Sequence, residues 1–118
     1  MSKHNETGIK GEQIAEKFLQ KNGYAILHRN WRFGKKEIDL VTQKGDLLVF
    51  IEVKTRSGFD FGFPEEAVDK RKQEFLKSAA EAFLDQFPGF EKIRFDIVSI
   101  LLEKEHVKEV FHIEDAFY

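Results

Sequence analysis

Cysteine is absent from the 118-residue sequence, which excludes disulfides, thiolate metal sites and a cysteine nucleophile. The four histidines lie far apart along the chain, so a zinc site is not expected. Long hydrophobic runs are also missing: the longest, residues 47–51, is far below the roughly 18 residues that a membrane-spanning helix needs. Residues 1–13 are polar and lack an apolar stretch of secretory type. We therefore expect a cytoplasmic protein.

An excess of positive charge is missing as well. Lys and Arg number 19 against 21 Asp and Glu, a formal net charge of −2, which excludes a protein that binds nucleic acid by bulk positive charge. Any basic face must therefore be argued from the positions of the cations. What the chain does have is 42% hydrophobic residues in a length suited to one domain, so residues 1–118 are expected to form a single domain.

Hydrophobic periodicity predicts an α/β fold. Helices are expected over residues 9–21 and between Pro64 and Phe87, where Pro64 in the first turn and Asp69 as the N-cap are alternative starts. Gly11 lies in the apolar stripe of the first helix and would let it sit close to a neighbour. Strands are expected at 24–28, 37–42, 47–53, 92–102 and 106–112, with a basic loop at 29–36 and another loop at 57–64. The order αβββαββ predicts a mixed central sheet flanked by helices, with 47–53 as a central strand.

Charged residues gather on two neighbouring predicted strands. Side chains alternate along a strand, so Glu37 and Asp39 share one face, as do Glu52 and Lys54. A two-residue turn at Lys44-Gly45 would pair residue 39 with 50 and 37 with 52, which puts all four groups on one face. A slip of two residues would set Asp39 directly opposite Glu52 and keep that face.

Carboxylates on such a face repel one another. Two of them about 4 Å apart repel by roughly 4 kcal/mol at an effective dielectric near 20. Lys54 offsets part of this, and a hard divalent cation would offset it fully, because Mg²⁺ takes oxygen ligands and is normally held by one or two carboxylates. The pattern therefore predicts a Mg²⁺ or Mn²⁺ site for phosphodiester hydrolysis, with Lys54 orienting water or neutralising the transition state. The alternative is that Glu52–Lys54 and Glu37–Arg56 are ion pairs worth roughly 0–1 kcal/mol each.

The sequence Asp39 … Glu52-Val53-Lys54 resembles the PD-(D/E)XK nuclease motif, most of all its Holliday-junction-resolvase-type branch. More closely still, the chain resembles the YraN-like family of small bacterial proteins, whose function is not established. The matching segments cover nearly the whole chain: GIKGE at 8–12, GY at 23–24, RNWR at 29–32, EIDL at 37–40, VFIEVKTR at 49–56, FG at 61–62, AV at 67–68, KQ at 72–73 and RFD at 94–96. The resemblance implies a restriction-endonuclease-like core with Asp39 and Glu52 as metal ligands and Lys54 as the catalytic lysine. The proline of the nuclease motif is absent here, since Ile38 precedes Asp39, as resolvase-like members commonly lack it too.

Two further acids are assigned as supporting ligands. In resolvase-like nucleases an acid from the first helix reaches the metal site, and Glu12 matches that position; a solvated helix acid is the alternative. Glu37 is either a further ligand or the ion-pair partner of Arg56. The cations that could contact nucleic acid are Arg29, Arg32, Lys35, Lys36, Arg56, Lys70, Arg71 and Lys72.

The sequence thus predicts a metal-dependent endonuclease that acts on DNA, with structured or branched DNA as a candidate substrate. The alternative is a non-catalytic module that keeps the nuclease fold and binds nucleic acid or a partner. Phe59, Phe61 and Phe63 could stack unpaired bases, or cover the core, or form a dimer contact. A homodimer is expected by analogy with the two-fold cleavage of symmetric junctions.

Overall fold

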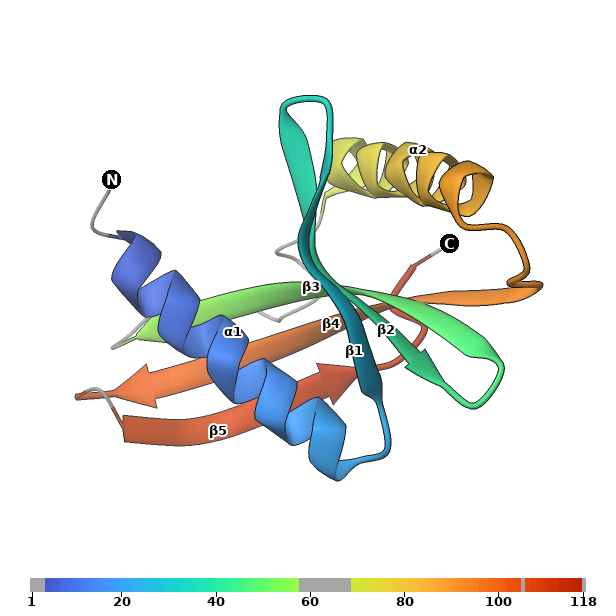
Figure 1. Cartoon of the computed structure of the whole chain (residues 1–118). Coiled ribbons are helices and arrows are strands. Elements are labelled where there is room, and N and C mark those ends of the chain that lie inside the picture. Colours follow the sequence, from blue (N-terminus) through green and yellow to red (C-terminus); the bar gives the residue numbers. More distant parts are fainter. Residues whose placement is uncertain (1–3, 58–68, 105, 118) are drawn as a thin grey trace.

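The computed structural model describes residues 4–57, 69–104 and 106–117 (Figure 1). Its elements, in chain order, are α1 (His4–Lys21), β1 (Ala25–Phe33), β2 (Lys36–Lys44), β3 (Leu47–Ser57), α2 (Lys70–Gln86), β4 (Lys92–Glu103) and β5 (His106–Ile113). The α/β class and the αβββαββ order are those predicted from the sequence. Phe59, Phe61, Phe63 and Pro64, in the predicted loop, lie outside the described residues.

The five strands form one mixed sheet in the order β1-β2-β3-β4-β5. Neighbouring strands are antiparallel except β3 and β4, which are parallel and joined by the crossover through α2. β3 is therefore the central strand, as expected from its apolar composition. α1 covers one face of the sheet and α2 covers the other (Figure 1).

The alternation of side chains along β3 builds both layers of the core. Val49 and Ile51 pack in the cluster beneath α1, whereas Leu48 and Phe50 pack beneath α2. All four side chains are buried, and burying each of them stabilises the fold by roughly 1.5–3 kcal/mol. The central strand is thus held rigidly from both sides, which fixes the position of the charged residues at its far end.

α1 approaches β3 closely because Gly11 has no side chain. A Cβ atom on Gly11 would overlap the hydroxyl of Thr55 on β3, so the close packing predicted for this glycine is confirmed. The approach brings Glu12, the next residue of α1, toward the end of β3 that carries Glu52 and Lys54.

The prediction of a basic loop over residues 29–36 is wrong. β1 continues through Phe33, and the turn to β2 is confined to Gly34-Lys35. Trp31 pairs with Ile38 on β2, and its ring packs edge-on against Phe83 of α2. β1 is an edge strand with many exposed positions, and such a polar strand has the composition of a loop.

The register of the β2–β3 hairpin also differs from the predicted one. The turn is Gly45-Asp46, with Gly45 at φ +62°, and Lys44 pairs with Leu47. This shifts the pairing by two residues, so the sheet faces are unchanged. Continuing the register from Leu40↔Ile51 sets Asp39 opposite Glu52.

β2 leaves β3 beyond Leu40. Simple alternation would put Ile38 and Leu40 on one face, yet Leu40 packs beneath α1 and Ile38 packs in the cluster beneath α2. The described pairing with β3 ends at Leu40, and the outer half of the β1–β2 hairpin turns away from the sheet as an arm (Figure 1). β2 and β3 therefore form a fork, and Asp39 lies at its base.

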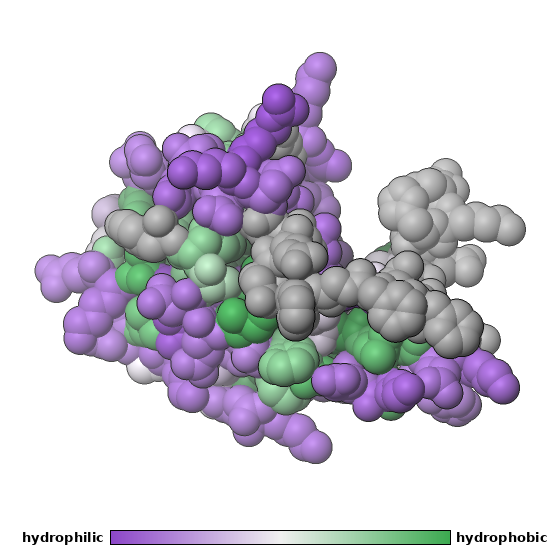
Figure 2. Space-filling view, turned by 180° about the vertical axis from the view of Figure 1, so that it is seen from behind, coloured by the Kyte–Doolittle hydropathy of each residue, from purple (hydrophilic) through white to green (hydrophobic). Residues whose placement is uncertain are grey.

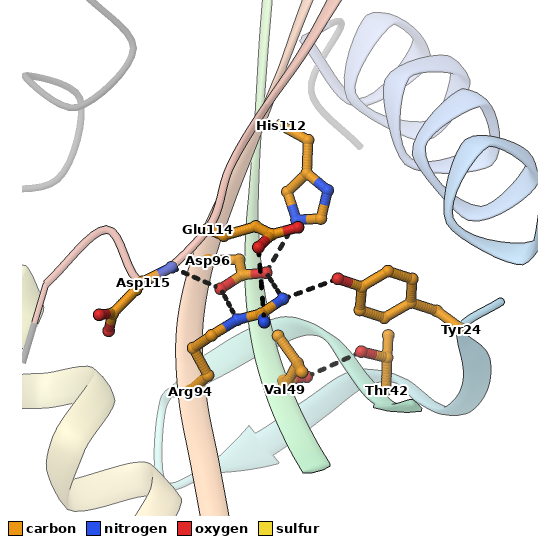
Figure 3. A network of polar contacts seen from close by, with 8 residues as sticks. All are labelled: Tyr24, Thr42, Val49, Arg94, Asp96, His112, Glu114 and Asp115. Atoms are coloured by element: carbon orange, nitrogen blue, oxygen red, sulfur yellow. Dashed lines mark hydrogen bonds and ion pairs between the residues drawn. The ribbon is translucent and has the colours of Figure 1, made fainter. Parts of the chain in front are cut away.

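A buried polar network ties β4 to β5 and to the end of the chain (Figure 3). Asp96 is fully buried and accepts two hydrogen bonds from Arg94, at 2.8 and 2.7 Å, and one from the backbone N–H of Asp115 at 2.9 Å. His112 Nε2 lies 2.8 Å from the same carboxylate, and Arg94 also donates to the hydroxyl of Tyr24 at 2.7 Å. Burial alone would raise the pKa of Asp96, but the hydrogen bonds from His112 and Arg94 hold it below its usual value.

On the face seen from behind, hydrophobic side chains form patches among hydrophilic ones (Figure 2). The large hydrophobic residues that are exposed in the described part of the chain are Ile9, Leu27, Phe33, Val107 and Phe111. Neither described helix has the length and apolar character that crossing a membrane requires.

Candidate active site

Glu52 is a buried residue in the middle of the central strand β3. Its side chain is 5% exposed, and its Oε2 atom lies 2.9 Å from Lys72 Nζ and 3.9 Å from Lys54 Nζ. Its Oε1 atom is buried and has no hydrogen-bond partner among the described residues. A buried carboxylate oxygen without a donor loses its hydration and gains no hydrogen bond in return. Among the described residues, only Oε2 of Glu52 therefore has compensating partners.

Asp39 faces Glu52 across the base of the fork. Its Oδ2 atom accepts a hydrogen bond from the backbone N–H of Val53 at 2.8 Å, which draws the carboxylate toward β3. Burial, followed by the negative charge of Glu52, raises the pKa of Asp39 to about 8 from its usual 3.8, although the Val53 N–H acts in the opposite direction. The two carboxylates therefore resist being charged together, as like charges in a shared site do.

Lys72 reaches the acids from the first turn of α2. Asp69 is the N-cap of this helix and accepts the backbone N–H of Lys72 at 2.9 Å, which settles the two alternative starts in favour of Asp69. Burial opposes the charged form of Lys72, but its hydrogen bond to Glu52 and the nearby negative charges raise the pKa above the usual value. The lysine expected from the motif, Lys54, lies farther from the carboxylate.

Glu12 and Glu37 meet at Asn30 on β1. With its nitrogen turned toward the acids, the Asn30 amide donates to Glu12 Oε1 and to Glu37 Oε1, each at 3.3 Å. Burial raises the pKa of Glu12, and the hydrogen bond from Asn30 lowers it by less. The negative charges of nearby glutamates raise it further; these are Glu37, Glu16 and Glu52. The structure thus places Glu12 near Asp39 and Glu52, and it joins Glu37 to Glu12 through Asn30, which the sequence analysis missed.

The backbone explains how Asn30 reaches the two acids. Asn30 has a φ of +50°, a left-handed conformation that asparagine adopts more readily than most residues. Its position in the RNWR segment, which contributed to the family resemblance, was the available signal.

Two acids of the site, Asp39 and Glu52, could hold a hard divalent cation together with water. The described residues do not already gather three acidic or histidine side chains around one point. Asp39 and Glu52 interact directly, however, and two carboxylates completed by water are a normal protein site for Mg²⁺. The unpartnered Oε1 of Glu52 is an oxygen ligand that no described side chain uses.

Of the eight predicted phosphate-binding cations, three have contacts within the fold, and the side chain of a fourth lies outside the described residues. Arg29 pairs with Glu16 of α1 at 2.8 Å, and Lys72 pairs with Glu52. Arg56 is half-buried near the end of β3 and takes part in a further interaction. The side chain of Lys36 lies outside the described residues.

The remaining four cations are exposed on two neighbouring elements. Arg32 and Lys35 belong to the β1–β2 arm, and Lys70 and Arg71 begin α2. The arm lies beside the start of α2 (Figure 1), and the ring of Phe33 stands 6.2 Å from that of Phe75. Lys70 and Arg71 thus share α2 with Lys72. Arg32 and Lys35 belong to the same hairpin as Asp39.

Comparison with known proteins places the chain in a family. Residues 11–100 match the model of the family described as "Uncharacterised protein family UPF0102", and the chain belongs to this family. A UPF0102 protein of Dictyoglomus thermophilum is 51% identical over 102 residues, which cover 86% of each chain. A UPF0102 protein of Flavobacterium psychrophilum is 44% identical over 118 residues, which cover 100% of this chain and 98% of the relative. The membership expected from the YraN-like motifs is thereby confirmed.

Among solved structures, the chain is similar to Pyrococcus furiosus SfsA in complex with Ca²⁺. The TM-score is 0.36 at 18% sequence identity, and the match covers 92% of this chain and 63% of SfsA. The chain therefore spans less than two thirds of that protein.

Proposed function

We propose that this protein is a metal-dependent phosphodiesterase that cleaves DNA, with structured or branched DNA as the candidate substrate class. The observation that supports this most is the buried Oε1 of Glu52 beside Asp39, which has no hydrogen-bond partner among residues 4–57, 69–104 and 106–117. A module that only bound phosphates would gain nothing from two carboxylates at its centre, because they repel phosphate. An acid pair that is incompletely neutralised is instead what a cation site requires.

Each residue of the site has a role in this proposal. Asp39 and Glu52 would hold Mg²⁺ or Mn²⁺, with Glu12 and Glu37 as supporting acids. A bound Mg²⁺ supplies Lewis-acid chemistry, which activates water and counters the negative charge of the phosphate. Lys54 orients the attacking water or offsets the charge that develops on the phosphate.

DNA would contact the cations around the fork. The proposed contacts are those predicted from the sequence: Arg29, Arg32, Lys35, Lys36, Arg56, Lys70, Arg71 and Lys72. The four exposed ones on the arm and at the start of α2 are best placed to bind phosphates. Because the net charge of the chain is −2, binding depends on this local group of cations and should weaken steeply with salt.

A cleavage assay with three forms of DNA tests the activity. Supercoiled, linear and four-way-junction DNA are incubated with the protein and Mg²⁺ or Mn²⁺, with EDTA as the metal-free control. The parent protein should cleave at least one form, and Glu52→Gln should not. Glu109→Gln, which alters an exposed acid on β5, is the matched control and should behave as the parent. DNA binding without cleavage, unchanged by metal or by Glu52→Gln, would support the non-catalytic module instead.

A binding assay tests the basic surface separately. In the Glu52→Gln background, which prevents cleavage, Arg32→Ala and Lys35→Ala should each weaken DNA binding regardless of sequence. Each should also reduce the slope of log K against log salt by about 1. Lys17→Ala, an exposed lysine on α1, is the control and should leave both quantities unchanged.

We also propose that the protein acts in the cytoplasm as a homodimer, because two cuts in a symmetric junction require two active sites. Sedimentation in the presence of four-way-junction DNA tests the dimer. A strict monomer on the junction would contradict it.

A further inference from the structure

Two lysines approach Glu52, and the one outside the nuclease motif is the closer. Lys72 Nζ lies 2.9 Å from Glu52 Oε2, within hydrogen-bond distance, whereas Lys54 Nζ lies at 3.9 Å. Lys54 shares a strand with Glu52, but Lys72 comes from α2, which covers that face of the sheet. The contact between Glu52 and Lys72 therefore links the central strand to the start of a helix.

We propose that Lys72 is the internal counter-ion of Glu52, that its charge on Oε2 opposes the binding of a divalent cation at Oε1 of the same carboxylate, and that it turns to a substrate phosphate when the cation binds. The identity of the opposed ion rests on the proposed function. The coupling between Glu52 and Lys72 does not depend on it.

The local structure lets the ammonium move while the helix stays in place. The Asp69 cap fixes the backbone of Lys72 at 2.9 Å, but the side chain has four rotatable bonds and is 39% exposed. The ammonium can therefore leave Glu52 for solvent or a ligand without any change in α2. By contrast, Asp39 is anchored to β3 through the Val53 N–H.

The charge around Lys72 favours a phosphate as its second partner. Lys70, Arg71 and Lys72 are consecutive cations in the first turn of α2, where positive charge opposes the helix dipole. Of these three cations, Lys72 is the one that forms an ion pair with Glu52. When Glu52 binds a cation instead, Lys72 loses its closest anion beside the exposed Lys70 and Arg71, and this local positive charge favours an anionic partner.

The direction of a cation-binding change separates this role from a structural one. If Lys72 merely supported the site, removing it would loosen Glu52 and weaken cation binding. If Lys72 opposes the cation, removing it removes a repelling charge beside the carboxylate, so the cation binds more tightly. By Coulomb's law, removing one unit charge beside a divalent ion is expected to tighten binding about tenfold.

A double-mutant cycle in EDTA measures the coupling without any metal. The unfolding equilibrium of Lys72→Met, Glu52→Gln and the double variant is followed in urea, with Lys54→Met in place of Lys72→Met as the matched cycle. We expect a coupling of about tenfold for Lys72 and about twofold or less for Lys54. Equal couplings, or a larger one for Lys54, would overturn the assignment of Lys72 as the counter-ion.

A Mn²⁺ titration by calorimetry tests whether Lys72 opposes the cation. Lys72→Met should bind Mn²⁺ about tenfold more tightly than the parent, Lys72→Arg should resemble the parent, and Lys54→Met should change less than Lys72→Met. If Lys72→Met does not fold, Lys72→Gln replaces it in both experiments. Unchanged or weaker binding by the neutral variant would overturn this opposition while leaving the metal site in place. Mn²⁺ binding by no variant would overturn both the opposition and the proposed metal-dependent function.

Discussion

Replacing Asp39 by asparagine is expected to stabilise the protein when no divalent cation is present. The carboxyl group of Asp39 has a pKa of about 8 in the folded chain against a usual value of 3.8, so folding disfavours its charged form. At pH 7 this difference would destabilise the fold by up to about 4 kcal/mol. Because the side chain is partly solvated and its titration is coupled to that of Glu52, we expect a gain of about 1–2 kcal/mol from Asp39→Asn.

The asparagine keeps the hydrogen bond that joins residue 39 to the backbone of Val53. Its amide oxygen can still accept the N–H of Val53, which Asp39 Oδ2 accepts at 2.8 Å. The ionisable group is lost and the shape is retained, so the change isolates the cost of charging this position, which comes from burial first and from Glu52 second. For a domain of this size, a gain of 1–2 kcal/mol raises Tm by about 5–10 °C.

The pH dependence carries the sign of the effect. The unfolded chain ionises Asp39 above its usual pKa of 3.8, whereas the folded chain keeps the proton until about pH 8. The destabilisation is therefore absent below pH 3.8, grows as the pH rises through this window and is constant above it. Thermal unfolding in EDTA between pH 4 and 9 should show the advantage of Asp39→Asn growing with pH. Asp85→Asn, an exposed acid on α2, should stay within about 0.5 kcal/mol of the parent.

Two results would refute this reasoning. An Asp39→Asn variant that is no more stable than the parent at pH 7 would mean that burial and Glu52 do not oppose the charge of Asp39. An advantage that is the same at pH 4 and pH 8 would mean that it arises from packing and not from ionisation.

Three further predictions concern the scaffold. Gly11→Ala should lower the free energy of unfolding in urea by about 1–3 kcal/mol because its methyl group meets Thr55, and adding Thr55→Ala should restore most of it. Asp96→Asn should lower it by about 3–5 kcal/mol, because Arg94 loses a buried partner. In the folded parent, the pKa of Asp96 lies below its usual 3.8. The stabilising contribution of its charged form should therefore be lost as the pH falls below 3.8, which unfolding followed by circular dichroism would show. Asp69→Ala should cost about 1 kcal/mol and speed hydrogen exchange in the first turn of α2.

The sequence sufficed to predict the fold because its strongest signals are local. The apolar positions of β3 alternate between two clusters, which requires cover on both faces and hence a central strand. The single charged position in the predicted strand, Glu52, stood out for the same reason. Gly11 was informative as well, since a glycine in an apolar helix stripe indicates close packing whatever the partner.

Residues on the hairpin arm were harder to place because their structure depends on distant partners. β1 was taken for a loop between residues 29 and 36, and the packing of Trp31 against Phe83 of α2 is what accounts for the strand there. The hairpin register was predicted two residues away from the observed one, since both Lys44-Gly45 and Gly45-Asp46 are acceptable turns. The predicted sheet face of Asp39 is nevertheless unchanged, because side chains along a strand alternate with a period of two residues.

Lys72 shows how a contact within the fold can be overlooked when a residue is grouped with its charged neighbours. The buried face of α2 runs through Leu76, Ala79, Ala80 and Phe83. Four residues before Leu76, one helical turn back on the same face, stands Lys72. As one member of the charged run 70–72, this lysine is predicted from the sequence only to contact nucleic acid. A lysine on the core-facing stripe needs an anion within the fold, and the acid on the central strand supplies it, so the two patterns together predict the 2.9 Å contact with Glu52 that neither predicts alone.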